Sequence, residues 1–337
     1  MKEIRDNARK LMEPHCKVCP TCNGKVCSGQ VPGMGGLGSG SSFGNNLEAL
    51  AKFKFNMRLI HDVVEPDTSV TILGKKLALP VVAAPIGGIE FNMGGKVSEE
   101  DYINAIIHGC RAKSIIGCTG DGVPDFIHEA GFAAIKSADG YGIPFIKPWE
   151  DEELYTKMEK AKTTGIDTIG MDIDAAGLIT LRKMGRPVSP KPLEKLTEII
   201  NKSGMKFILK GVMTPDEAEL AVQCGADAIV VSNHGGRVLD HAPGAADVLE
   251  SIAEAVKGRL TIFADGGVRT GGDVLKLLAL GTNAVMIGRP FSVAAIGGLQ
   301  EGVESYIDTI TTELKQTMVL TGTRSAAEVK SNILFRK

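Results

Sequence analysis

The segment "VVSNHGGRVLDH" (230–241) places side chains that can do acid–base chemistry directly after a run of apolar residues. His234 has the side chain type that titrates near neutral pH and can act as a base. Arg237 lies three residues further on and carries a permanent charge that can hold a carboxylate. Together they suit proton removal from a carboxylate-bearing substrate. The alternative is a buried structural histidine, and the residues at the other strand ends decide between the two.

Four cysteines within twelve residues form a second group, called here the cysteine cluster: Cys16, Cys19, Cys22 and Cys27. Their spacing is Cys-x₂-Cys-x₂-Cys-x₄-Cys, and thiolates this close together bind zinc or iron–sulfur clusters. A middle cysteine shared by two short gaps favours an iron–sulfur cluster, because zinc sites usually have two separated pairs. An iron–sulfur cluster, zinc and no metal remain three hypotheses. A metal here would either accept electrons from the flavin or stabilise the structure of the N-terminal segment.

Composition excludes several classes of protein. The 337 residues have a formal net charge of −2 and no basic stripe, which argues against nucleic-acid binding. No apolar stretch reaches the roughly 18 residues of a membrane span, and the charged N-terminus lacks the apolar region of a secretory signal. We therefore expect a cytoplasmic protein. In that reducing compartment the seven cysteines are not expected to form a disulfide framework.

Eight short apolar runs alternate with segments of helical spacing. The runs cover residues 79–86, 113–118, 143–147, 168–174, 206–210, 228–233, 260–267 and 284–290. This alternation predicts a parallel sheet covered by helices, and eight units predict an α/β fold, the (β/α)8 TIM barrel. A doubly wound open sheet is the alternative, although six strands would suffice for it. We predict a cysteine- and glycine-rich N-terminal arm over residues 1–45, followed by the barrel over 46–337.

Polar or glycine residues end most of these runs. They are Lys147, Asp172, Asp174, Lys210, Ser232, His234, Asp265, Gly288 and Arg289. In a barrel, the carboxyl ends of all strands meet at one mouth, where active sites lie. The sequence therefore predicts that these residues share one site, and this favours a catalytic over a structural His234.

The last two runs both end in glycine and arginine. Gly266, Gly267 and Arg269 follow the seventh run, and Gly288 and Arg289 follow the eighth. Glycine lets backbone N–H groups approach an anion, and the loops after strands seven and eight commonly bind phosphate in barrels. The pattern favours a phosphate site over two ordinary turns with surface arginines.

Three motifs carry a resemblance to a known family. They are "SNHGGR" (232–237), "ADGGVRTGGDVLKLLALGTNAVMIGRP" (264–290) and "LALPVVAAPIGG" (77–88), with "SFGNN" and "TILGKKL" upstream. Over roughly residues 40–320 the chain resembles the FMN-dependent α-hydroxy-acid oxidases and dehydrogenases, such as glycolate and lactate oxidases. The resemblance implies FMN as cofactor and oxidation of a 2-hydroxy acid to the 2-oxo acid. It also implies a homo-oligomer.

The resemblance implies a role for each matching residue. His234 would take a proton from the substrate, and Arg237 would hold its carboxylate. Asp174 would pair with His234, and Lys210 would lie near the N1–C2 edge of the flavin. Ser232 and the stretch Ala84, Pro85 and Ile86 would line the flavin. The ribityl chain and phosphate would contact Asp265, Gly266, Gly267, Arg269, Gly288 and Arg289.

The chain departs from this family around the substrate. The two family tyrosines are absent, one before "SFGNN" and one in "IPFIKPWED", where Trp149 lies nearby. Lys147 replaces a flavin-contacting glutamine, and Asp172 replaces a threonine. A second substrate arginine would fall near Leu181, with Arg182 beside it. The substrate is therefore expected to carry a carboxylate for Arg237, but its side chain is not indicated.

Other classes remain as alternatives. Type II isopentenyl diphosphate isomerases and the synthase domain of glutamate synthase also use FMN barrels, and a non-catalytic flavin-binding scaffold is a third hypothesis. The "SNHGGR" histidine favours the oxidase over an isomerase, which has no need of a base paired with a carboxylate clamp. The terminal electron acceptor, oxygen or another, is not indicated by the sequence.

Overall fold

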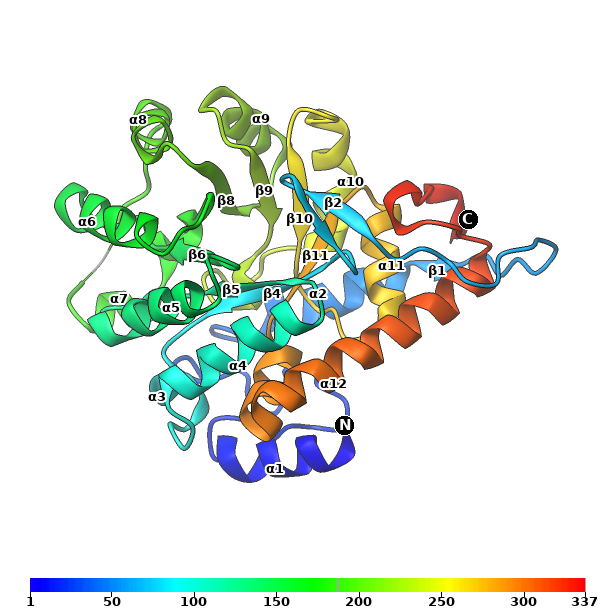
Figure 1. The fold of residues 1–337 in the computed structure, drawn as a ribbon, viewed down its shortest axis with the longest axis horizontal. Coiled ribbons are helices and arrows are strands. Elements are labelled where there is room, and N and C mark those ends of the chain that lie inside the picture. The colour runs from blue at the N-terminus through cyan, green and yellow to red at the C-terminus, as the bar shows by residue number, and fades with distance from the viewer. Residues whose placement is uncertain (187, 337) are drawn as a thin grey trace.

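The computed structural model describes residues 1–186 and 188–336, and it contains the expected (β/α)8 barrel. Eight parallel strands close in the order β10-β11-β4-β5-β6-β7-β8-β9 (Figure 1). Their bounds are β4 (Val81–Ile86), β5 (Ile116–Thr119), β6 (Ile143–Ile146), β7 (Thr168–Asp172), β8 (Lys206–Val212), β9 (Ala228–Val231), β10 (Thr261–Ala264) and β11 (Ala284–Ile287). Each overlaps one predicted run, because continuous β-branched sequence is buried on both faces of a barrel strand.

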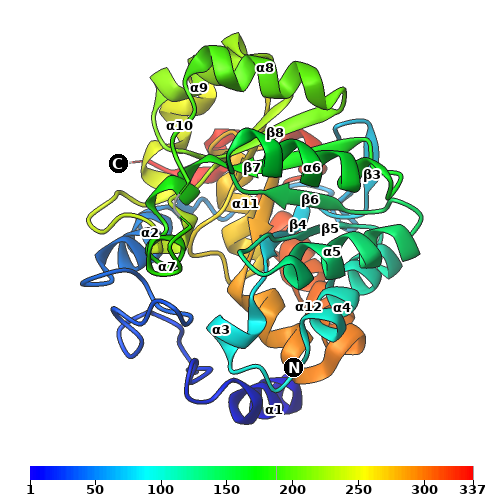
Figure 2. The same ribbon diagram turned by 90° about the vertical axis from the view of Figure 1, so that its left-hand side faces the viewer.

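Helices surround this barrel between successive strands (Figures 1 and 2). They are α4 (Glu99–Ala112), α5 (Asp125–Ser137), α6 (Asp151–Lys162), α7 (Ile179–Lys183), α8 (Leu193–Ser203), α9 (Pro215–Gln223), α10 (Ala245–Ala255), α11 (Gly271–Ala279) and α12 (Arg289–Thr321). Helix α9 begins after Thr214, whose side chain accepts a hydrogen bond from the Glu217 N–H. A capping box between Thr270 and Asp273 starts α11 in the same way.

A short hairpin lies at the amino-terminal end of the barrel, and a second small sheet lies beside α11. The antiparallel hairpin of β2 (Val70–Ile72) and β3 (Lys75–Leu77) lies at that end, because Lys206 at the start of β8 donates to the Leu73 carbonyl at 2.6 Å. The second small sheet pairs β1 (Lys54–Phe55) with β12 (Leu334–Phe335). These strands have too few residues to show a period in the sequence. The hairpin does not cover the opposite end, where the carboxyl ends of the barrel strands meet, and a binding site can form there.

The N-terminal arm runs from α1 (Lys2–Met12) to α2 (Ser41–Lys52) and passes on the side where α3 (Ile89–Met93) and α7 lie (Figure 2). Helix α1 packs on α12, where Asn7 donates to the Gly297 carbonyl at 2.8 Å. The boundary expected after residue 45 falls inside α2. Across the two described ranges, no helix combines the length and apolar character that crossing a membrane requires.

Candidate active site

One cavity of about 300 Å³ opens at the carboxyl ends of the barrel strands. Most residues proposed from the sequence line it, namely Ala84, Pro85, Ile86, Lys147, Asp172, Lys210, His234, Arg237, Asp265, Gly266, Gly267, Arg269, Gly288 and Arg289. Three of the other site residues do not. Asp174 and Ser232 lie behind the lining, and Arg182 is exposed on α7 while its neighbour Leu181 is buried and lines the cavity.

His234 is held in a left-handed turn at the end of β9. Its φ is +57°, and Gly235 and Gly236 follow at +61° and +80°. The Ser232 hydroxyl accepts from the His234 N–H at 3.0 Å, and the Asn233 side chain accepts from the Gly236 N–H at 3.1 Å. Asn46 on α2 donates to the same Asn233 oxygen at 2.8 Å. The backbone of the histidine is therefore fixed by side chains from two distant parts of the chain.

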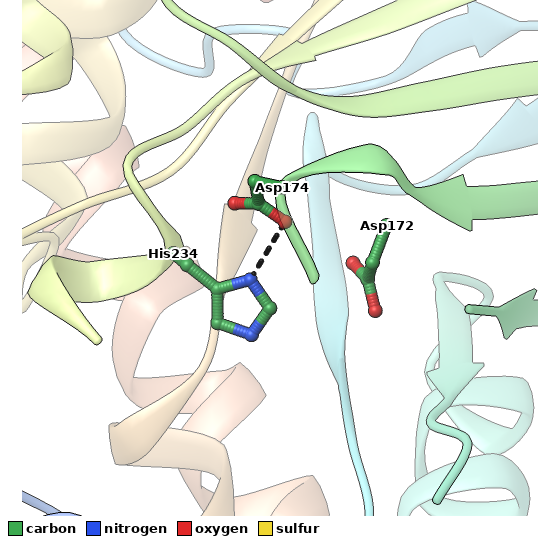
Figure 3. A group of neighbouring side chains, drawn as sticks. All are labelled: Asp172, Asp174 and His234. Atoms are coloured by element: carbon green, nitrogen blue, oxygen red, sulfur yellow. Dashed lines mark hydrogen bonds and ion pairs between the residues drawn. The ribbon is translucent and has the colours of Figure 1, made fainter. Parts of the chain in front are cut away.

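Asp174 holds the ring of His234. Its Oδ1 lies 2.9 Å from His234 Nδ1, the contact drawn in Figure 3. Burial acts to raise the pKa of Asp174, but His234 and Lys210 outweigh it, so the pKa is lowered. The carboxyl group can come this close because Gly211 (φ +114°) has no side chain, and a Cβ there would lie 2.6 Å from Asp174 Cβ. The ionised carboxylate thus faces the imidazole at neutral pH.

Two buried lysines share the carboxylate of Asp172. Lys210 Nζ lies 3.5 Å from Asp172 Oδ1, and Lys147 Nζ lies 3.9 Å from Asp172 Oδ2. Asp265 Oδ2 lies 3.8 Å from Lys210 and accepts from Ser232 at 2.8 Å. Burial acts to lower the pKa of Lys210, but the surrounding carboxylates outweigh it and raise the pKa. Lys210 is therefore a permanent buried cation at this end of the barrel.

Asp172, Asp174 and His234 offer ligand atoms within 4.8 Å of one another, a spacing that a metal ion could use (Figure 3). The ammonium groups of Lys210 and Lys147 already neutralise Asp172 at the distances given above. A divalent cation would be repelled by both lysines. The arrangement is therefore better suited to acid–base chemistry than to metal binding.

Arg237 is buried and is oriented by three groups outside its own loop. One guanidinium nitrogen donates to the carbonyl of Gly33 and, at 3.5 Å, to that of Gly35 in the N-terminal arm. The other donates to Asn92 Oδ1 at 2.8 Å. Burial lowers the pKa of Arg237 to about 10, which leaves it charged at neutral pH. Since a guanidinium has five N–H donors, some remain for a ligand carboxylate.

The end of the cavity near α11 and α12 carries two further arginines. Arg289 donates from Nε to the Met34 carbonyl at 2.9 Å and lies 4.2 Å from the centre of the Phe43 ring. Burial, with repulsion from Arg237 and Arg269, lowers the pKa of Arg289 to about 9. Like charges brought together in this way favour the binding of an anion between them.

Comparison with known proteins gives the family. Residues 33–187 and 180–336 match the FMN-dependent dehydrogenase family. The chain belongs to this family. An L-lactate oxidase of Lactobacillus jensenii is 32% identical over 316 residues, which cover 85% of this chain and 76% of that protein. Glycolate oxidase 5 of Oryza sativa subsp. japonica is 31% identical over 331 residues and 85% of each chain. A crystal structure of mandelate oxidase with 2-hydroxy-phenylacetamide superimposes with a TM-score of 0.80 at 25% identity, covering 100% of this chain and 97% of that one.

The cavity of this FMN-dependent dehydrogenase fits the cofactor of its family. Gly266 and Gly267, which line it, have φ of +93° and +80°, and a Cβ at either would meet Asn46 at less than 3 Å, so only glycine fits this turn beside α2. Among the residues that the structure describes, Asp172 Oδ1, Asp265 Oδ1 and Arg269 Nε are buried and have no hydrogen-bond partner. FMN offers a ring N–H, ribityl hydroxyls and a phosphate, which are the partners that these atoms lack. Its phosphate would lie at Arg269 and Arg289.

Several residues that shape the site were not found from the sequence. Asn92 and the carbonyls of residues 33–35 orient Arg237, and Asn46 supports the histidine turn. Asp121 accepts from the Lys147 backbone N–H at 3.1 Å and from Trp149 Nε1 at 2.6 Å. Trp149 is consequently 2% exposed and lies outside the cavity lining, so it does not occupy the place of a family tyrosine. The position of Asp121 two residues after the end of β5 was the signal that could have found it.

The cysteine cluster lies outside the cavity lining, and its four thiols are free and partly exposed. Within residues 1–186 and 188–336, no three of its sulfur atoms lie within 4.8 Å of one another. Metal binding at these cysteines therefore stays a prediction. The other three cysteines are buried, as expected for core residues.

Proposed function

We propose that this chain oxidises a 2-hydroxy acid to the 2-oxo acid with FMN, and that His234 takes a proton from the substrate. The reaction class rests on the FMN-dependent dehydrogenase family and on relatives named as oxidases of lactate, glycolate and mandelate. The observation that supports the proposed base is the 2.9 Å contact between His234 Nδ1 and Asp174 Oδ1 inside the barrel mouth. An isomerase would not need this pair of a base and a carboxylate, so the contact favours the oxidase over the isomerase hypothesis.

Asp174 prepares His234 for its role. With Nδ1 engaged by the carboxylate, Nε2 is the nitrogen free to accept a proton. The lowered pKa of Asp174 keeps it ionised, so it stabilises the imidazolium that forms. In a 2-hydroxy acid the atoms that must be deprotonated and oxidised are adjacent to the carboxylate. A base and a carboxylate clamp three residues apart match that geometry.

Arg237 and Lys210 supply the two positive charges that the reaction needs. FMN, when bound, accepts the two electrons that leave the substrate carbon. Arg237 holds the substrate carboxylate with the N–H groups that do not contact Gly33, Gly35 and Asn92. Lys210, kept cationic by its carboxylate neighbours, stabilises negative charge in the barrel mouth. Lys147 and Asp172 contribute a further ion pair at the same place.

We infer a substrate with an apolar side chain from the walls of the cavity around His234. Pro32 and Met34 come from the N-terminal arm, Phe91 from α3, and Leu178 and Leu181 from the segment around α7. Where a second substrate arginine would fall, the chain has buried Leu181, and Arg182 points to solvent. A single arginine clamp with apolar walls favours a monocarboxylate such as lactate or a larger analogue.

The cellular setting forms part of the same proposal. Seven free thiols suit a reducing compartment, which favours the cytoplasm. A homo-oligomer stays a prediction from the resemblance, and the sequence does not indicate which acceptor reoxidises the flavin.

Anaerobic titration of the purified protein tests the proposal. The visible spectrum should show flavin bands, and at least one of glycolate, L-lactate or mandelate should bleach them. The apolar walls predict that L-lactate or mandelate acts at lower concentration than glycolate. Flavin bands that no 2-hydroxy acid bleaches, in a protein that dithionite does reduce, would contradict the proposed reaction and favour a scaffold or an isomerase.

A further inference from the structure

The cysteine cluster precedes the residues that match the family model. The match to the FMN-dependent dehydrogenases begins at residue 33, after all four cysteines. The barrel and the site chemistry proposed above do not require them. Their presence in an ordered segment between α1 and α2 calls for a separate explanation.

The first half of the cluster forms a tight turn of the kind that presents thiolates to a metal. The Val18 N–H donates to Cys16 Sγ at 3.4 Å, and Val18 has a φ of +43°, unusual for a branched residue. Two arginines of α1 fix this turn from outside: Arg5 donates to the Cys19 carbonyl at 2.7 Å, and Arg9 to the Val18 carbonyl at 3.1 Å. Backbone N–H groups aimed at sulfur stabilise the thiolate that a metal needs.

The second half of the cluster is fitted against the barrel. Gly24 (φ +77°) is buried, and a Cβ there would lie 2.4 Å from the Phe43 ring, so the turn between Cys22 and Cys27 rests on that ring. Arg269 donates to Cys22 Sγ at 3.6 Å. The guanidinium of Arg289 packs on the same Phe43 ring, so this turn and an arginine of the cavity contact one side chain.

The charge of the neighbouring barrel residues favours a negatively charged cluster. Arg269 contacts Cys22 Sγ directly, and Arg289 packs on the same Phe43 ring that the turn between Cys22 and Cys27 rests on. Four thiolates that bind one metal centre carry net negative charge, so these arginines would stabilise the metal-bound form.

We propose that the cysteine cluster is a tetrathiolate metal site, for zinc or an iron–sulfur cluster, that fastens the N-terminal arm beside the arginines of the cavity. Sulfur ligands at about 2.3 Å from zinc lie roughly 3.8 Å apart, and among the described residues no three sulfurs of the cluster lie within 4.8 Å of one another, so they must move closer to bind a metal. Val18 and Gly24 are buried, but the other residues between the ligands are exposed, which leaves room for this approach: Lys17, Pro20, Thr21, Asn23, Lys25 and Val26. Spacing and thiol chemistry are common to both metals, so the experiment must separate them.

The test measures zinc, iron and acid-labile sulfide in protein purified anaerobically, together with its visible spectrum and flavin content. The test variant is Cys16→Ser/Cys19→Ser, which removes the first turn without touching Arg269. The matched control is Cys224→Ser, whose hydroxyl can keep the hydrogen bond that Cys224 Sγ makes to the Ala221 carbonyl. Protein treated with Zn²⁺, or with ferrous iron and sulfide, provides a second measurement if metal is lost during purification.

Zinc at about one atom per chain, or iron and sulfide in equal amounts with broad absorbance beyond the flavin bands, is the expected result. The double variant should lose at least 90% of that metal while the control keeps it, and flavin per chain should not change in either variant. Metal content unchanged in the double variant overturns the proposal. So does a metal-free protein that takes up neither metal and whose four thiols all react freely with a thiol reagent. Neither outcome bears on flavin reduction by hydroxy acids.

Discussion

Replacement of Gly211 by alanine probes the positioning of the catalytic pair without changing any reacting group. Gly211 has a φ of +114°, and an added Cβ would lie 2.6 Å from Asp174 Cβ and 2.7 Å from its Cγ. An ordinary carbon contact is about 3.6 Å, so Asp174 must retreat by about 1 Å. The 2.9 Å contact to His234 Nδ1 would then exceed hydrogen-bond length.

Two costs follow from the geometry. Backbone strain at this φ costs about 1–3 kcal/mol, and overpacking beside Asp174 adds about 1–3 kcal/mol. We expect Gly211→Ala to lower the free energy of unfolding by about 3 kcal/mol. Misplacement of the carboxylate by about 1 Å should lower kcat/KM by about 100-fold.

Gly204→Ala is the matched control. Gly204 also has a left-handed backbone, with φ +60°, but no atom lies within 4 Å of its added Cβ. The control should therefore lose about 1 kcal/mol of stability and keep its kcat/KM. Urea unfolding and anaerobic stopped-flow reduction of the flavin measure the two quantities. If Gly211→Ala reduces the flavin at near the parent rate, Asp174 does not act through His234 as described.

Three further predictions concern the same site and the arm beside it. Asp174→Asn should lower kcat/KM by about 100-fold, because an amide no longer stabilises the imidazolium that forms during proton removal; a variant that reduces its flavin at near the parent rate would argue against the pairing. Arg237→Lys should raise KM about 10- to 100-fold and lower kcat less, since a point charge replaces a fork of donors; steady-state kinetics separate the two parameters. The Ser39 N–H and the Ser41 hydroxyl donate to Asp240 and hold the pKa of its carboxyl below its usual range. This depressed pKa means that ionised Asp240 stabilises the docked arm above about pH 4 and loses that effect as pH falls. Hydrogen exchange in residues 33–41 should therefore rise in acid, and Asp240→Asn should show the same rise at neutral pH.

The barrel could be predicted from the sequence because its signal is repeated and continuous. Runs such as 206–210 and 228–233 became β8 and β9, which begin at the predicted residues and end two residues later and two residues earlier, respectively. The strands β1 and β12 were not predictable, since a two-residue strand has no period and depends on a partner about 280 residues away. The short helix α7 was missed for a similar reason, because five residues do not complete a helical pattern.

The site was predictable wherever a strand end fixes the side chain. Lys210 and His234 reach the cavity because β8 and β9 end there. Asn92 was not predictable, because its contact with Arg237 depends on how the N-terminal arm folds across the mouth. Trp149 illustrates the opposite error. Its position after the third predicted run suggested that it lies near the substrate, but its indole N–H donates to the buried Asp121 carboxylate, away from the cavity lining.

The measurement that tests the central claim most directly is the rate of anaerobic flavin reduction in His234→Gln. The variant keeps a side chain of similar reach, and Ser232 still accepts from its backbone N–H, so the turn and the flavin content should not change. With the substrate found by titration, we expect reduction to slow by about 10²- to 10⁴-fold while dithionite still bleaches the flavin. A variant that reduces its flavin within tenfold of the parent rate would contradict His234 as the base.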